Sequence, residues 1–208
     1  MTTPLDHHAD NRTGTVRAAR LFSNIVSPPV IFAVVGLLLA VNAMPTLPQA
    51  LFWAALYGFM VSLLPILFVL WLLKTGRVAE LHMSNTKERT LPYIVAVLSA
   101  AVLYAIVWLI DGPEFMKCLA LFNMVTLSIL GVINSFWLIS FHATAITAAW
   151  AIIFLTFGRQ ASLIVAVLVV LVVIVRLYLK RHTFSQIIAG IALGISSVLL
   201  LTEFGCFV

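Results

Sequence analysis

Cationic and imidazole side chains gather in three stretches of the sequence, each beside an apolar segment. The stretches are residues 81–93, 137–145 and 175–190, and they carry His82, Lys87, Arg89, Ser140, His142, Arg176, Lys180 and His182 without a matching set of carboxylates. This combination suits a phosphate group, because arginine forks match its oxygens and histidines supply a nucleophile and a proton donor near neutral pH. The histidines and acidic residues lack the spacing of a metal site, so we expect neither a metal nor another cofactor.

Arg176 lies about one turn inside an apolar run, where an arginine costs about 2.5–3.5 kcal/mol to insert into a membrane. We interpret it as a phosphate ligand rather than a side chain that only reaches the membrane surface. Arg181 follows the run and is interpreted as an interfacial anchor. Asn123 and Asn134 are candidates for polar contacts between helices.

The order of these residues resembles the three motifs of the type 2 phosphatidic acid phosphatase superfamily, the membrane lipid phosphate phosphatases. Arg176 and His182 reproduce the spacing of the third motif, with five residues between them. Ser140-Phe141-His142 resembles the second motif except at its central glycine, and residues 89–92 resemble the first with the proline displaced. The resemblance covers roughly residues 81–194 and makes Gly190 and Gly194 small packing residues of a helix.

The resemblance implies metal-independent hydrolysis of a lipid phosphate or prenyl (di)phosphate, the work of a phosphoric monoester hydrolase. His182 would attack phosphorus and form a phosphohistidine, and His142 would protonate the leaving alkoxide. Gln186 stands where the family has an aspartate that orients the nucleophile. The implied phosphate-binding residues are Arg89, Arg176, Ser140, Lys87 and His82.

The departures from the family keep other functions open. The amide of Gln186 can accept the imidazole N–H but stabilises an imidazolium less well than a carboxylate does. Phe141 replaces a glycine and Val175 replaces a serine, and His82 falls where the family has a lysine. One alternative is a weakened or inactive relative that binds anionic lipid. Another is a small membrane transporter or scaffold whose basic loops only set its topology.

The elements that must position these residues are apolar. The chain has 208 residues, of which 63% are hydrophobic and 9% charged, whereas soluble domains carry about 25% charged residues. Seven stretches are near the length of about 20 residues that spans a membrane: 28–44, 50–73, 91–110, 116–138, 142–157, 161–179 and 185–202. They predict an all-α, polytopic transmembrane helix bundle of six to seven spans, with membrane lipids and not nucleic acid as partners.

The domain organisation follows from the same pattern. Residues 1–20 are predicted to form a polar, flexible N-terminal segment without the features of a cleaved signal peptide. Residues 21–208 are predicted to form a single transmembrane phosphatase-like domain. Cys118 and Cys206 leave the redox compartment open, and the sequence leaves the lipid and the oligomeric state open.

The order of spans places the N-terminus and the loops 74–90, 139–142 and 180–184 on one side of the membrane. Of the 12 lysine and arginine residues, only Lys117 and Arg159 fall on the other side. This asymmetry predicts an integral membrane protein, of the inner or plasma membrane in a bacterium, with its N-terminus and motifs in the cytoplasm. The family resemblance implies the opposite, because related phosphatases mostly work at the outer or lumenal face.

Overall fold

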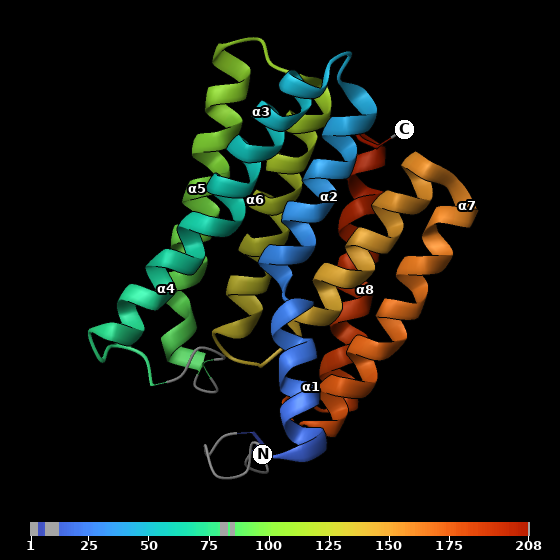
Figure 1. Cartoon of the computed structure of the whole chain (residues 1–208). Helices are drawn as coiled ribbons and strands as arrows, with labels where there is room; N and C mark the ends of the chain where they lie inside the picture. Colours follow the sequence, from blue (N-terminus) through green and yellow to red (C-terminus); the bar gives the residue numbers. More distant parts are fainter. Residues whose placement is uncertain (1–3, 7–12, 80–82, 84–85, 208) are drawn as a thin grey trace.

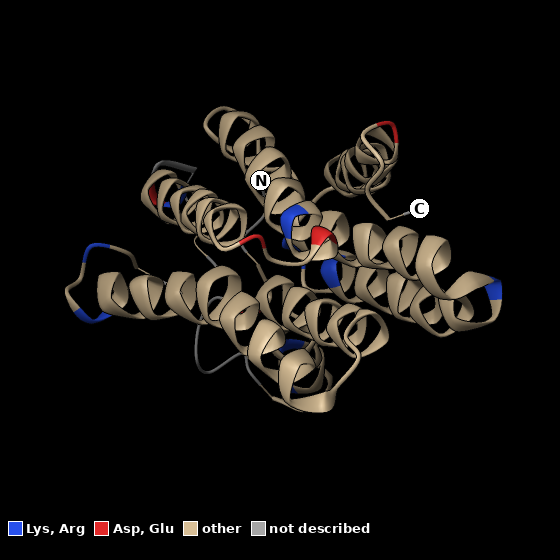
Figure 2. Ribbon diagram, turned by 90° about the horizontal axis from the view of Figure 1, so that it is seen from above, with Lys and Arg blue, Asp and Glu red and all other residues tan. Residues whose placement is uncertain are grey.

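The computed structural model describes residues 4–6, 13–79, 83 and 86–207, and it shows helices and no strand in this part of the chain. The helices run side by side as a bundle, with few charged residues along them (Figures 1 and 2). Prolines open three of them, at the first turn where the missing N–H has no helical partner. The elements are α1 (Gly14–Ile25), α2 (Pro28–Ala43), α3 (Leu47–Tyr57), the π-helical turn η2 (Gly58–Leu63), α4 (Leu64–Lys74), the short 3-10 helix η3 (Thr86–Arg89), α5 (Thr90–Leu109), α6 (Glu114–Asn134), α7 (Phe141–Tyr178) and α8 (Phe184–Thr202).

The helix α7 is a hairpin of two limbs rather than one straight rod. Gly158 breaks it with a φ of 80°, a left-handed conformation that glycine adopts without steric cost. The chain then folds back, so that the two limbs lie beside each other (Figure 1). The two apolar stretches expected over residues 142–157 and 161–179 are these two limbs.

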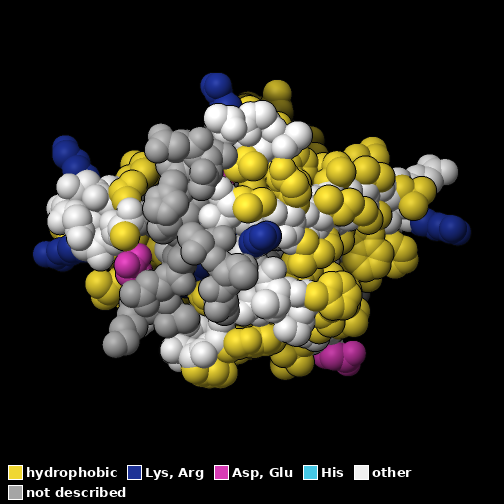
Figure 3. Space-filling view, turned by 90° about the horizontal axis from the view of Figure 1, so that it is seen from below, with side chains coloured by type: hydrophobic (Ala, Val, Ile, Leu, Met, Phe, Trp, Pro, Cys, Tyr) yellow, Lys and Arg dark blue, Asp and Glu magenta, His cyan; other side chains and the backbone are white. Residues whose placement is uncertain are grey.

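With the hairpin α7 counted once, five of the described helical segments are long and apolar enough to cross a membrane, or up to six when α1 and α2, bent by 43°, form one span. One of the five is Leu47–Lys74, which combines α3, η2 and α4. Large hydrophobic side chains reach the surface over much of the molecule, as the view from below shows (Figure 3). These observations confirm the prediction of an all-α bundle and are compatible with an integral membrane protein.

The N-terminal region differs from the prediction of a flexible segment over residues 1–20. The helix α1 begins at Gly14, and Asp6 is buried, with 1% of its surface exposed. The segment carries enough apolar residues for an amphipathic helix, and Phe22 packs against the core of the bundle. Within α1, Thr15 and Arg17 are exposed whereas Phe22 packs inward, so a helix with one polar face accounts for this part of the polar stretch.

The two ends of the bundle carry different groups. The N-terminus, the start of α5 and the junction between α7 and α8 lie at one end, and the C-terminus lies at the other (Figure 1). Near the C-terminus a disulfide joins Cys118, at the start of α6, to Cys206, which follows α8. The start of α5 and the connection between α7 and α8 thus lie at the end opposite this disulfide.

The start of α7 packs closely against α8, which confirms that Gly190 and Gly194 are packing residues. A Cβ atom at Gly190 would lie 2.6 Å from the carbonyl oxygen of Ser140 and 3.2 Å from the Cβ of Ala143. At Gly194 it would collide with Thr144 and Thr147. Small residues at these positions let the helix backbones approach each other.

We therefore expect Gly190→Ala to destabilise the protein by about 1–3 kcal/mol, since the backbone at Ser140 cannot move aside without shifting α7. Gly58→Ala is the matched control, because a Cβ there has no heavy atom closer than 4.0 Å. Thermal unfolding in detergent measures both variants. Equal melting temperatures for the two would contradict the close packing of α7 on α8.

Candidate functional site

A cavity of about 450 Å³ opens among α2, η2, α4, α5, α6 and α7, and its lining includes Arg89 at the end of η3 and residues of the connections that flank the helices. Four of the predicted site residues line it: Arg89, His142, Arg176 and His182. Most of the remaining wall is apolar, and none of the described residues that line it is acidic. Segments far apart in the sequence therefore contribute two guanidinium and two imidazole groups to one apolar cavity.

Arg176 reaches the cavity from the last turn of α7 and is 3% exposed. Its Nη1 donates a hydrogen bond to Ser23 Oγ at 3.0 Å. Its Nε has no hydrogen-bond partner among the described residues. A buried charged donor without an acceptor is costly, so Arg176 is a strong candidate for binding an anion in the cavity.

Arg89 ends the 3-10 helix η3 and is held by hydrogen bonds from two sides. Its Nε donates to the carbonyl oxygen of Met83 at 2.8 Å, and its Nη1 donates to Asn134 Oδ1 at 3.1 Å. The amide of Asn134 in turn donates to the hydroxyl of Tyr93 at 3.2 Å. Asn134 joins α5 and α6 as the sequence suggested, but it also fixes a cavity residue, which sequence reasoning missed.

His182 lies in the short connection between α7 and α8 and is 7% exposed. Its Nδ1 is 3.3 Å from the carbonyl oxygen of Leu138. Because a carbonyl only accepts, Nδ1 carries the proton and Nε2 has the lone pair that a nucleophile needs. Burial, followed by the positive charges of Arg176 and Arg89, holds the pKa of His182 well below its ordinary value of 6.5. The imidazole is therefore neutral at physiological pH.

Gln186 and Ser140 support the starts of two helices and do not line the cavity. Gln186 Oε1 accepts from the backbone N–H of Thr183 at 3.0 Å, and Thr183 Oγ1 accepts from the backbone N–H of Gln186 at 3.4 Å, which forms a capping box for α8. The Gln186 side chain also acts to raise the pKa of His182, as the smallest of the influences on that group. Ser140 caps α7, its Oγ accepting from the backbone N–H of Ala143 at 3.4 Å. These caps hold the segments that present His142 and His182.

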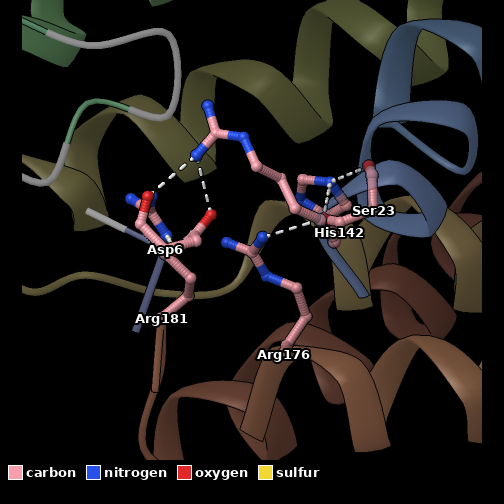
Figure 4. Close-up of polar contacts among 6 residues, drawn as sticks. Asp6, Ser23, His142, Arg176 and Arg181 are labelled. Atoms are coloured by element: carbon pink, nitrogen blue, oxygen red, sulfur yellow. Dashed lines mark hydrogen bonds and ion pairs between the residues drawn. The ribbon is translucent and has the colours of Figure 1, made fainter. Parts of the chain in front are cut away.

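His142 is connected to the N-terminal helix. Its Nε2 is 3.1 Å from the carbonyl oxygen of Ser23 and 3.4 Å from Ser23 Oγ, and Figure 4 shows Ser23 between His142 and Arg176. Sequence reasoning missed Ser23. The only signal for it is a single serine among the apolar residues near the end of an amphipathic segment.

Asp6 is a second residue that the sequence analysis did not identify. Its carboxylate accepts from Arg20 Nη1 at 2.9 Å and from Arg181 Nε at 2.8 Å (Figure 4). The prediction that Arg181 anchors the chain at the membrane surface is therefore wrong, because its side chain is only 3% exposed and forms a buried ion pair. The ion pair between Asp6 and Arg181 holds the N-terminal segment against the connection between α7 and α8.

Two predicted phosphate ligands cannot be placed at the cavity. His82 lies outside the described residues, and Lys87 is described only as part of the backbone of η3. In the described part of the chain, no group of three histidine, cysteine or acidic side chains could hold a metal ion. No family model, curated protein or solved structure matches the chain.

The depressed pKa of His182 makes stability depend on pH. The unfolded chain takes up a proton at His182 near its ordinary pKa of 6.5, and the folded protein does not until a lower pH. The stability that His182 contributes is complete above about pH 6.5, and it falls as the pH drops from there toward the lower pKa of the folded protein, by up to about 1.4 kcal/mol per pH unit. We expect the melting temperature of His182→Gln to fall less than that of the wild type when the pH is lowered from about 7 to about 5. Equal losses in thermal unfolding would show that His182 is protonated in the folded protein.

Proposed function

We propose that the cavity binds the phosphate group of a membrane lipid and that the chain hydrolyses a lipid phosphate or prenyl (di)phosphate through a phosphohistidine at His182. The observation that carries the proposal is the unsatisfied Nε of Arg176, buried beside Arg89, His142 and His182 in a cavity without a described carboxylate. Phosphate oxygens are acceptors that a guanidinium binds with good geometry. The motif resemblance supports the same chemistry.

The shape and lining of the cavity support an amphiphilic substrate. The cationic and imidazole groups of the cavity come from the end of η3, the two ends of α7 and the connection before α8. In contrast, α2, η2 and α4 contribute apolar wall through residues such as Phe32, Val61 and Val69. A phosphate headgroup fits the first region and a hydrocarbon chain fits the second. A soluble phosphate ester would leave the apolar wall without a role.

The reaction uses groups that already lie at the cavity. The lone pair on His182 Nε2 attacks phosphorus, and the bond from phosphorus to the leaving oxygen breaks. His142 donates a proton to the leaving alkoxide, and Arg89 and Arg176 bind the remaining phosphate oxygens as their charge develops. Water then attacks the phosphohistidine, His142 accepts its proton, and inorganic phosphate leaves. The attack on phosphorus requires the neutral imidazole of His182, because only this form has a lone pair on Nε2.

One observation favours a second candidate, a relative that binds anionic lipid without hydrolysing it. Gln186 caps α8 at the position where the resembling family has a carboxylate. An amide can orient His182 but does not neutralise the positive charge that develops on it. Binding depends on Arg89 and Arg176 and needs no such charge.

We expect the purified protein to release phosphate from phosphatidic acid or a prenyl diphosphate with EDTA present, because the proposed reacting groups are side chains. His182→Ala should abolish release, since it removes the nucleophile, and a ³²P-labelled substrate should label the wild type but not this variant. Arg159→Ala is the control, an arginine beside the break at Gly158 and away from the cavity. Lipid binding without phosphate release in the wild type would support the non-catalytic candidate, and release by His182→Ala would refute the assigned nucleophile.

We also propose that this end of the bundle faces the cytoplasm. Basic residues concentrate in the loops on this side, as is typical of cytoplasmic loops. The Cys118–Cys206 disulfide lies at the other end, and disulfides persist in oxidising compartments outside the cytoplasm. Two independent features therefore support one orientation, which would direct the site to lipids of the inner leaflet.

Single cysteines at the two ends test this orientation. Ala79 is exposed in the loop after α4, and Thr46 is exposed in the turn before α3. We expect a membrane-impermeant maleimide to label Thr46→Cys in intact cells and Ala79→Cys only after the membrane is opened. The native cysteines can remain because they are paired. The reverse pattern would place the site on the outer face, as in the related phosphatases.

A further inference from the structure

We propose that Ser23, on α1, is a positioning residue that sets the place of Arg176 and His142 at the cavity. The inference rests on the proposed function, because it names the residue that aligns two groups of that site. Ser23 lies outside the three motif stretches and is 2% exposed. It contacts both groups at once, through its side chain and its backbone (Figure 4).

The backbone of Ser23 fixes the tautomer of His142. Ser23 is in the last turn of α1, whose final carbonyl groups have no partner within the helix. Its carbonyl oxygen lies 3.1 Å from His142 Nε2, and a carbonyl only accepts. Nε2 therefore carries a proton in the hydrogen bond to Ser23, and this bond fixes the orientation of the imidazole ring. This arrangement suits a histidine that donates a proton to a leaving group and recovers it from water.

The hydroxyl of Ser23 fixes the guanidinium of Arg176. A guanidinium only donates, so Ser23 Oγ accepts from Nη1 at 3.0 Å. The same oxygen is 3.4 Å from His142 Nε2. One oxygen atom thus determines the separation of an anion-binding group and a proton-transfer group. Phosphoryl transfer depends on such placement, because errors of about 1 Å can lower rates by roughly a hundredfold.

Other contacts hold α1 where Ser23 can act. Thr15 hydrogen-bonds the hydroxyl of Tyr178 at 2.7 Å, close to Arg176 along α7. Arg20 pairs with Asp6, which also pairs with Arg181. These contacts attach α1 and the segment before it to the end of α7 and to the connection before α8, at two points that follow Arg176 closely in the sequence.

The experiment compares Ser23→Ala, Ser23→Thr and the control Ser197→Ala, which alters another buried serine, on α8. Binding of inorganic phosphate is followed by the rise in melting temperature, and turnover by phosphate release from phosphatidic acid. Loss of a hydrogen bond to a charged group should raise the half-saturating phosphate concentration and the KM of Ser23→Ala by about tenfold or more. Ser23→Thr keeps the hydroxyl and should restore both values, and Ser197→Ala should match the wild type.

The outcomes separate this inference from the proposed function. Wild-type phosphate binding and KM in Ser23→Ala would overturn the positioning role and leave the proposed function intact. Phosphate binding without hydrolysis in the wild type would refute the enzyme, and the binding shift in Ser23→Ala would still support the role of Ser23. No response of the wild type to phosphate would refute both. If Ser23→Ala does not fold, Ser23→Val replaces it, because valine and threonine have the same shape and differ in the hydroxyl.

Discussion

A guanidinium buried among apolar helices needs an acceptor for each of its N–H groups, and Arg176 lacks one at Nε among the described residues. The available carboxylate, Asp6, is paired with Arg20 and Arg181. Positive charge thus exceeds negative charge around the cavity, in surroundings where an uncompensated charge is expensive. An anionic ligand removes this imbalance. The proposed function, the role of Ser23 and the neutral state of His182 all depend on the excess of positive charge around the cavity.

The histidines of the cavity lie at or beside the ends of helices rather than in a long loop. Ser140 caps α7 just before His142, and the capping box of Thr183 and Gln186 follows His182 directly. Gly190 lets α8 approach the start of α7 closely. Helix ends carry backbone groups that need partners, and here the caps that satisfy them also fix the histidines. Stability and site geometry therefore share the same hydrogen bonds.

Local patterns made the helices and four of the cavity residues predictable, because apolar length specifies spans and the spacing of Arg176 and His182 lies within one short segment. The contacts of Ser23 and Asp6 were not predictable. Apart from the ion pair of Asp6 with Arg20, they join residues 119 to 175 positions apart, and a single serine or aspartate has no local signature. The helical part of residues 1–20 was missed because polar composition is shared by flexible segments and by the outer face of an amphipathic helix. Arg181 was misread because its partner lies at the other end of the chain.

Gln186 decides how the proposed chemistry balances binding against turnover. A carboxylate at this position would stabilise the imidazolium formed when His182 attacks, and it would also cancel part of the positive charge that attracts phosphate. The amide is uncharged, so it keeps the cationic character of the cavity while it caps α8. The amide of Gln186 therefore favours the neutral, nucleophilic imidazole of His182, and it stabilises the charged imidazole that forms after the attack less well than a carboxylate would. Under the proposed function, we therefore expect tighter phosphate binding and slower phosphate transfer than a carboxylate at this position would give.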